Sequence, residues 1–140
     1  MTVWLCIINE FSWPTVRDNR LYGVPDSRAR VKIYLTKPED VLIFYCISPV
    51  KAIVGIYKVT SKVFEDRDPA PWEDRLYPYR IRIKPFSREL KELSKPIPLE
   101  AIAGKLSKVK HTRSMMGKSM IRLTTEDFNF IKSLIRGEEK

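Results

Sequence analysis

The chain has 140 residues, a formal net charge of +9 and 44% hydrophobic residues. This length is typical of one domain, and the hydrophobic fraction is that of a globular protein rather than a disordered one. No apolar run approaches the roughly 20 residues that span a bilayer, and the N-terminus lacks the pattern of a signal peptide. We therefore expect a cytoplasmic protein without a membrane partner, and its positive charge favours polyanions as ligands.

The first part of the chain predicts a buried strand, a short helix and an ambiguous segment. Thr2–Ile8 is a continuous apolar run, which is typical of a central strand buried on both faces. Ser12-Trp13-Pro14 is a helix-start pattern, and we expect this helix to end near Asn19. Leu21–Pro25 predicts a turn or a strand edge. Arg28–Leu35 alternates basic with apolar residues, which permits either a strand or a turn of helix.

Three strands are predicted in the middle of the chain. Val41–Ile47 is an apolar run that predicts a buried strand, and Ile53–Val63 predicts a long strand with a kink at Gly55. Glu65–Leu76 is polar and rich in proline, so we expect a loop there. Tyr79–Pro85 alternates basic and apolar residues at every position up to Lys84, which is the clearest strand pattern in the sequence.

The last part predicts a short helix over Pro98–Gly104, a final strand within Gly117–Leu123 and a C-terminal helix that ends at Gly137. Thr124 and Asp127 have the spacing of a capping box at the start of that helix. Its apolar residues fall on one face: Phe128, Ile131, Leu134 and Ile135. Because strands predominate and no βαβ rhythm is present, we predict an α+β fold with a small antiparallel or mixed barrel and helices at its ends.

The sequence lacks the residue sets of catalysis, metal binding and cofactor binding. His111 is the single histidine, and it lies in a basic stretch that carries no nucleophile motif. Cys6 and Cys46 lie inside apolar runs, which predicts buried, reduced thiols rather than a disulfide or a metal site. Gly117-Lys118-Ser119 resembles the end of a phosphate-binding loop, but Thr112 stands where that loop needs its first glycine. We therefore predict no enzyme activity, no metal and no cofactor.

Basic residues and loop aromatics instead favour nucleic-acid binding. Residues 101–125 contain six lysines or arginines and no acid. Two further basic groups are Arg80, Arg82 and Lys84 on one strand, and Arg17, Arg20, Arg28, Arg30 and Lys32 near the N-terminus. Cations near phosphates release condensed counterions, which drives binding. Four aromatic residues stand in turns, where a ring can stack on an unpaired base: Trp13, Tyr22, Trp72 and Tyr77. Trp13 has a second interpretation, as a hydrophobic staple of its own helix.

At this point the order and spacing of several segments resemble a known family. The segments are Val3-Trp4-Leu5 with Asn9 and Trp13, Tyr22-Gly23-Val24-Pro25, Lys37-Pro38-Glu39-Asp40 before Val41–Tyr45, Val54-Gly55-Ile56-Tyr57, Tyr77-Pro78-Tyr79-Arg80, and Met116-Gly117-Lys118-Ser119-Met120. Together they resemble the archaeal branch of the EVE domain family, which belongs to the PUA-like superfold and is similar to the YTH readers of methylated adenine. The resemblance covers nearly the whole chain.

The resemblance implies a PUA-like curled mixed β-barrel, flanked by short helices and a C-terminal helix, as one domain over residues 1–137 with a frayed tail at 138–140. It also implies a pocket for a flipped-out, modified base in RNA or DNA, in which Tyr22 replaces the usual tryptophan as one wall and Asn9 bonds the base edge. The implied base-pocket residues are Asn9, Trp13, Tyr22, Gly23, Val24, Ser48, Trp72 and Tyr77. The expected backbone-binding residues are Arg80, Lys105, Lys108, Lys110, His111, Arg113, Lys118 and Arg122.

Two other functions stay open at this point. One is an enzyme or small-ligand-binding protein that uses the same pocket, with Glu10, Asp40 or His111 as its acid or base. The other is a protein-interaction adaptor for partner enzymes encoded elsewhere. The sequence specifies neither the base, nor RNA against DNA, nor the oligomeric state.

Overall fold

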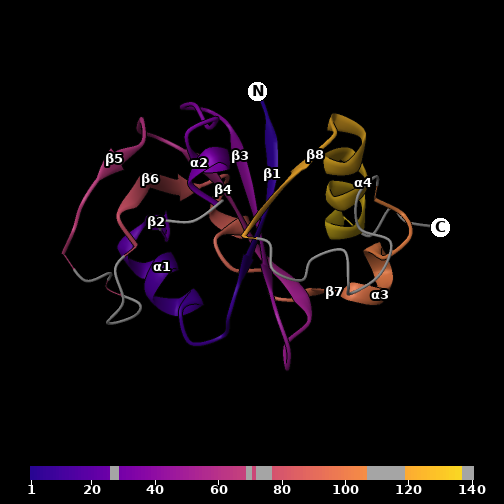
Figure 1. The fold of residues 1–140 in the computed structure, drawn as a ribbon. Coiled ribbons are helices and arrows are strands. Elements are labelled where there is room, and N and C mark those ends of the chain that lie inside the picture. Colours follow the sequence, from indigo (N-terminus) through magenta and orange to yellow (C-terminus); the bar gives the residue numbers. More distant parts are fainter. Residues whose placement is uncertain (26–28, 69–70, 72–76, 107–118, 137–140) are drawn as a thin grey trace.

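The computed structural model of the chain describes residues 1–25, 29–68, 71, 77–106 and 119–136. One curled sheet with the strand order β2-β6-β4-β3-β1-β8 forms its centre (Figure 1). The path comprises β2 (Leu21–Val24), β6 (Tyr79–Pro85), β4 (Ala52–Val59), β3 (Val41–Cys46), β1 (Val3–Ile8) and β8 (Met120–Leu123). Two short strands lie beside it, β5 (Phe64–Glu65) on β6 and β7 (Ile97–Pro98) on β4. β1 and β3 are parallel whereas the other pairs are antiparallel, so the sheet is mixed.

The central strands are buried on both faces, as their continuous apolar sequences predict. Alternate residues of β1 enter two separate hydrophobic clusters. Trp4 and Cys6 belong to the cluster that includes residues of β2 and β6, whereas Val3 and Leu5 belong to the cluster under the C-terminal helix. A strand exposes successive side chains to opposite faces, so β1 has to be apolar at nearly every position.

Helices cover the two faces of the sheet. α1 (Trp13–Asn19) and α2 (Ala29–Ile33) contribute Val16 and Ile33 to the first cluster, and α3 (Leu99–Ile102) and α4 (Thr125–Arg136) pack on the second. In Figure 1, α4 stands on the opposite side of the central strands from α1. The 3-10 turn η1 (Arg88–Leu90) lies between β6 and β7. Among the described residues, no helix is long and apolar enough to cross a bilayer.

The predicted capping box of α4 is confirmed. The Thr124 backbone N–H donates to Asp127 Oδ2 at 3.1 Å, and the Asp127 N–H donates to Thr124 Oγ1 at 3.0 Å. The predicted apolar face is also present, because Phe128 and Ile131 are fully buried in the second cluster. Gly137, the predicted end of this helix, lies outside the described residues.

The structure resolves one ambiguity, corrects the length of one strand and confirms the start of α1. The segment Arg28–Leu35, for which the sequence permits either a strand or a turn of helix, contains the helix α2, and Ile33 lies inside the first cluster. The predicted strand Ile53–Val63 is shorter, since β4 ends at Val59. The register of β3 with β4 shifts where Phe44 pairs with Gly55 and Tyr45 with Ile53, which is an irregularity at the expected kink. The helix-start pattern at Ser12-Trp13-Pro14 is confirmed, since α1 begins at Trp13 and ends at Asn19, although Ser12 makes no side-chain cap.

The sheet curls until its two edge strands approach each other. The Tyr22 hydroxyl of β2 donates to the carbonyl of Ser119, immediately before β8, at 3.3 Å. Lys32 Nζ of α2 donates to the Met120 carbonyl of β8 at 2.8 Å. Side chains therefore bridge the gap between β2 and β8, which we call the seam.

Candidate functional site

A cavity of about 200 Å³ opens at the seam, beside the ends of β1 and β3. Its walls come from six parts of the chain: the end of β1, the start of α1, β2 with the residue after it, the turn after β3, the segment before β6 and the residue before β8. The lining residues are Ile7, Ile8, Asn9, Ser12, Val16, Tyr22, Gly23, Pro25, Ile47, Tyr77 and Ser119. This seam cavity combines apolar walls with a few polar groups, the usual composition of a ligand site.

Asn9 presents a hydrogen-bond donor to the seam cavity. Its Oδ1 accepts the backbone N–H groups of Phe11 at 3.0 Å and Ser12 at 2.8 Å. Two donors at one atom identify that atom as the oxygen, because an amide nitrogen cannot accept them. Nδ2 has no hydrogen-bond partner among the described residues, so it remains able to donate. Asn9 thus stabilises the turn before α1 through its oxygen and supplies a polar group to the lining of the cavity.

Tyr22 forms a buried wall rather than an open stacking platform. Only 4% of the residue is exposed, and its ring packs edge-on against Phe44 with the centroids 5.4 Å apart. Burial raises the pKa of its phenol well above the usual range, and the nearby Cys6 thiol adds to the effect. The hydroxyl therefore stays protonated and donates to the Ser119 carbonyl. Tyr22 therefore contributes a buried, uncharged ring to the cavity wall.

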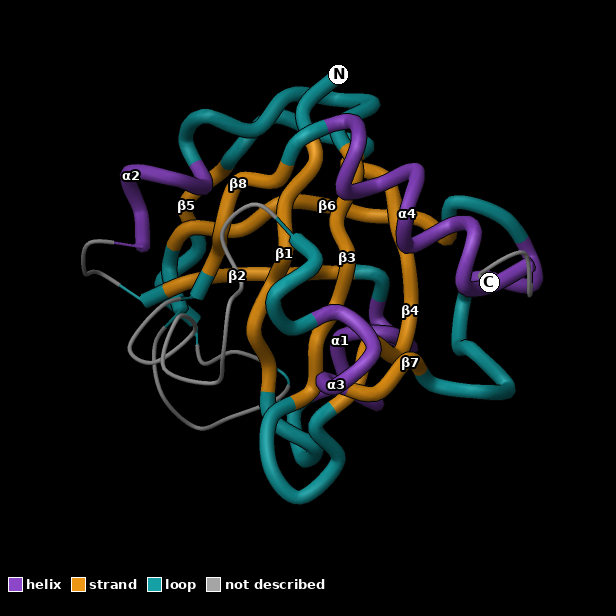
Figure 2. Tube along the Cα trace, turned by 90° about the vertical axis from the view of Figure 1, so that its right-hand side faces the viewer, coloured by secondary structure: helices purple, strands orange, loops and turns teal. Residues whose placement is uncertain are grey.

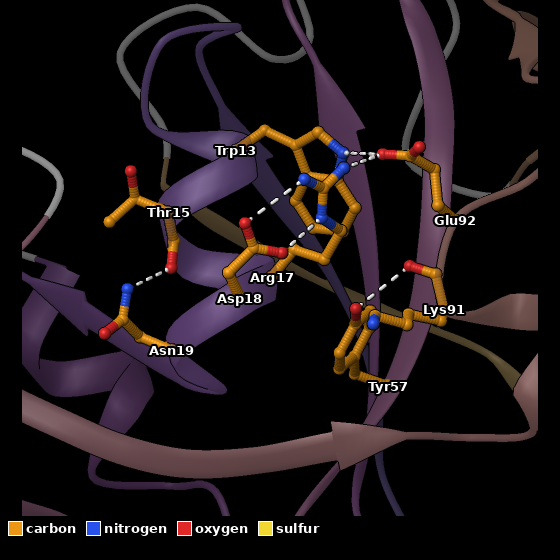
Figure 3. Close-up of polar contacts among 8 residues, drawn as sticks. All are labelled: Trp13, Thr15, Arg17, Asp18, Asn19, Tyr57, Lys91 and Glu92. Carbon is orange, nitrogen blue, oxygen red and sulfur yellow. Dashed lines mark hydrogen bonds and ion pairs between the residues drawn. The ribbon is translucent and has the colours of Figure 1, made fainter.

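Trp13 does not line the seam cavity. It is 5% exposed, and its ring centroid lies 5.2 Å from that of Phe44. Its Nε1 donates to Glu92 Oε1 at 3.3 Å, and Arg17 forms an ion pair with the same carboxylate (Figure 3). These contacts attach α1 to the segment after η1. Trp13 thus packs its own helix against the sheet, in line with its second interpretation.

The other predicted pocket residues are placed as follows. Gly23 and Tyr77 line the seam cavity together with Asn9 and Tyr22. Val24 is buried in the first cluster, and Ser48 is exposed in the turn between β3 and β4, one residue after Ile47. Trp72 lies outside the described residues.

Sequence reasoning missed several cavity residues because they become neighbours through the fold. Ile47 reaches the cavity because β3 runs parallel to β1, with Ile8 opposite Cys46 and the Ile47 N–H donating to the Ile8 carbonyl at 2.9 Å. Ser12 enters from the turn that Asn9 builds. In the sequence, Ser12 is part of the helix-start pattern before Trp13 and Pro14, which predicts a helix and not a cavity residue.

The predicted backbone-binding residues differ in exposure. Arg80 was expected on an exposed strand face with Arg82 and Lys84; instead it is 3% exposed and pairs with Asp66 at 2.9 Å. It also donates to the carbonyls of Tyr77 and Asp68. Arg80 is therefore committed to the fold, and this expectation is corrected. Strand alternation failed here because β5 and its following turn cover the start of β6.

Arg122 on β8 and Lys105 after α3 are exposed, and the Lys105 ammonium lies 5.8 Å from the Phe130 ring. Five predicted residues fall outside the described residues: Lys108, Lys110, His111, Arg113 and Lys118. The N-terminal basic group is partly engaged within the molecule. Arg17 pairs with Glu92 and Asp18, and Arg30 donates to the Tyr79 hydroxyl at 3.3 Å.

Of the groups expected for the enzyme alternative, Asp40 has structural partners, Glu10 is half-buried in the turn after β1, and His111 lies outside the described residues. The Asp40 carboxylate accepts the backbone N–H groups of Thr2 at 2.9 Å and Lys37 at 3.0 Å, so it closes a turn. Cys6 and Cys46 are free and buried, and burial raises the pKa of both thiols. Within the described ranges, no group of three or more metal-ligating side chains gathers.

Comparison with known proteins agrees with this architecture. The model of the EVE domain matches residues 2–134. The chain belongs to the EVE domain family. An archaeal relative, a UPF0310 protein of Pyrococcus abyssi, is 31% identical over 96% of this chain and 100% of its own length.

Solved structures share the fold of this EVE domain at low sequence identity. The human THYN1 protein, in complex with DNA that contains 5-methylcytosine, superimposes with a TM-score of 0.69 at 17% identity and covers 100% of this chain and 99% of its own. The YTH domain of Mmi1 in complex with RNA gives a TM-score of 0.65 at 14% identity, over 97% of this chain and 78% of its own. The fold is therefore the PUA-like half-barrel.

Proposed function

We propose that this EVE domain binds RNA or DNA and accepts a flipped-out, modified base in the seam cavity, without catalysis of its own. The observation that carries the proposal is Asn9 on the wall of a small, largely apolar cavity at the seam, with an Nδ2 donor that has no partner among the described residues. Pockets for extruded bases combine apolar or aromatic walls with a few hydrogen bonds to the base edge.

The size of the seam cavity supports a single base. Its volume of about 200 Å³ is below the roughly 300–1,000 Å³ of sites for drug-sized ligands. Ile8, Val16 and Ile47 line it with aliphatic carbon. A methyl group on the base would gain about 0.8 kcal/mol by leaving water for such a wall, which corresponds to a preference of roughly fourfold for a methylated base.

The positive charge of the protein supports binding of a polyanionic strand around that base. The chain carries 26 lysines and arginines against 17 acids. Arg122 is exposed on β8, next to the acid-free segment that precedes this strand in sequence. The solved complexes of THYN1 with DNA and of the Mmi1 YTH domain with RNA share the fold. In our proposal the backbone-binding residues are Lys105, Lys108, Lys110, Arg113, Lys118 and Arg122.

Asn9→Asp separates the structural role of Asn9 from its role in binding. An aspartate keeps an oxygen for the Phe11 and Ser12 N–H groups, so the turn persists, but it replaces the Nδ2 donor by an acceptor. Asn19→Asp is the matched control, because Asn19 is an exposed residue of α1 and receives the same change of charge.

The assay is titration of oligonucleotides with one 5-methylcytosine in DNA or one N6-methyladenine in RNA, at low salt, beside unmodified versions. Wild-type protein is expected to prefer a modified strand. Asn9→Asp should weaken that binding about 5- to 150-fold, the range of a lost buried hydrogen bond of roughly 1–3 kcal/mol, while Asn19→Asp retains it. Absence of binding to all of these strands refutes the proposal, and equal affinities of the two variants refute the role of Asn9.

A further inference from the structure

Three exposed apolar side chains stand in the two segments that enter the seam cavity after β1 and β3. Phe11 lies between the lining residues Asn9 and Ser12, and the Val50 N–H donates to the carbonyl of the lining residue Ile47 at 3.1 Å. Phe11 is 81% exposed, Ile47 41% and Val50 39%. Because β1 and β3 are parallel and end in register at Ile8 and Cys46, the segments that follow them leave the sheet at the same end (Figure 2). Ile47 also lines the cavity, so the exposed apolar rim and the cavity wall are continuous.

Phe11 is held in place although its ring is exposed. Its backbone N–H donates to Asn9 Oδ1 at 3.0 Å, so the residue that equips the cavity also fixes the chain at Phe11. Two residues span at most about 7 Å, which places the Phe11 Cα within that distance of the Asn9 Cα. Successive bases of one strand rise by about 3.4 Å, so Phe11 stands within about two base steps of the cavity residue Asn9.

We propose that Phe11, flanked by Ile47 and Val50, is a wedge that stacks on the base next to the one in the seam cavity and fills the space left in the strand. This inference rests on the proposed function. Extruding a base costs a few kcal/mol of stacking, and an inserted apolar side chain replaces part of the lost contact. An aromatic ring contributes roughly 1–3 kcal/mol for each base on which it stacks.

The test compares Phe11→Ala with Leu35→Ala, because Leu35 is a 55% exposed apolar residue of the chain that does not line the cavity. Each variant is titrated with a duplex that contains one 5-methylcytosine, with a single-stranded RNA that contains one N6-methyladenosine, and with the two free modified nucleosides. Phe11→Leu is included because it keeps an apolar side chain without an aromatic face.

Phe11→Ala should weaken binding of the oligonucleotide about 5- to 150-fold, Phe11→Leu should fall between it and wild type, and Leu35→Ala should match wild type. Nucleoside affinity should be unchanged in all three, because a nucleoside has no neighbouring base. If wild-type protein binds an oligonucleotide and Phe11→Ala binds it equally well, the wedge alone is refuted. The wedge is also refuted if Phe11→Ala weakens the nucleoside to the same degree. If wild-type protein binds none of the probes, the proposed function fails as well.

Discussion

Gly55 lies in β4, where the Trp13 ring of α1 packs against the strand. A Cβ added there would come within 2.9 Å of Trp13 Cη2 and 2.9 Å of the Lys91 carbonyl oxygen. Real Cβ atoms essentially never approach heavy atoms so closely, and one of the two obstacles is backbone. Gly55 is therefore required for space, and Gly55→Ala should displace Trp13 and with it the start of α1.

The expected cost follows from two opposing effects. Overpacking of a close-packed core costs about 1–3 kcal/mol. Alanine recovers about 0.5–1 kcal/mol, because it loses less conformational freedom on folding than glycine. At the midpoints of these two ranges the net loss is about 1 kcal/mol, which for a domain of this size corresponds to a decrease in Tm of about 3–5 °C.

Thermal unfolding followed by circular dichroism measures this loss, and a double-mutant cycle identifies its cause. Trp13→Phe shortens the ring that faces Gly55, so Gly55→Ala should cost less in the Trp13→Phe background, with a coupling energy of about 0.5 kcal/mol or more. The same Tm for Gly55→Ala and wild type would refute the packing argument. An identical loss in both backgrounds would show that Trp13 is not the obstacle.

Two further predictions concern the helix cap and the buried thiols. Asp127→Ala removes half of the capping box and should lower the free energy of unfolding, measured in urea, by about 0.5–2 kcal/mol. Glu126→Ala removes an exposed side chain of the same helical turn and should lower it less. Equal losses in the two variants would contradict the capping role of Asp127. Burial, with a smaller effect from the charge of Glu10, raises the pKa of Cys46 to about 11, so between pH 9 and 11 the unfolded chain loses a proton that the folded chain keeps. The free energy of unfolding should therefore fall as pH rises from 9 to 11, by up to about 1.4 kcal/mol per pH unit for this thiol, and less steeply in Cys46→Ala; a flat profile in wild type would contradict this.

Much of the fold was predictable because the strands here carry clear local signals. The apolar run of β1 follows from burial on both faces, and the alternation of β6 identified its bounds, Tyr79–Pro85. Prediction failed where tertiary contacts decide the outcome. Arg80 belongs to an alternating basic face in the sequence, yet Asp66 and two backbone carbonyls hold it inside the protein.

The candidate site was predictable only in part. The family resemblance predicts Asn9, and Tyr22 is predicted both by that resemblance and by its place in a turn; both residues line the seam cavity. Ile47 and Ser119 were not named, because Ile47 becomes a neighbour through the parallel pairing of β1 with β3, and Ser119 through the curl that brings β8 to β2. No periodic pattern in the sequence indicates that Ile47 lies beside the end of β1 or that β8 lies near β2.

The position of the cavity follows from how the sheet ends. Edge strands expose unpaired backbone groups and have to be protected. Here the Met120 carbonyl accepts a hydrogen bond from Lys32, and the Tyr22 hydroxyl adds a second one to the Ser119 carbonyl, which already pairs with the Ile7 N–H of β1, so side chains rather than a further strand cross the seam. Side-chain bridges leave space that a backbone ladder would close, and that space is the seam cavity. The polar groups that close the half-barrel thus also shape the site that we propose for a base.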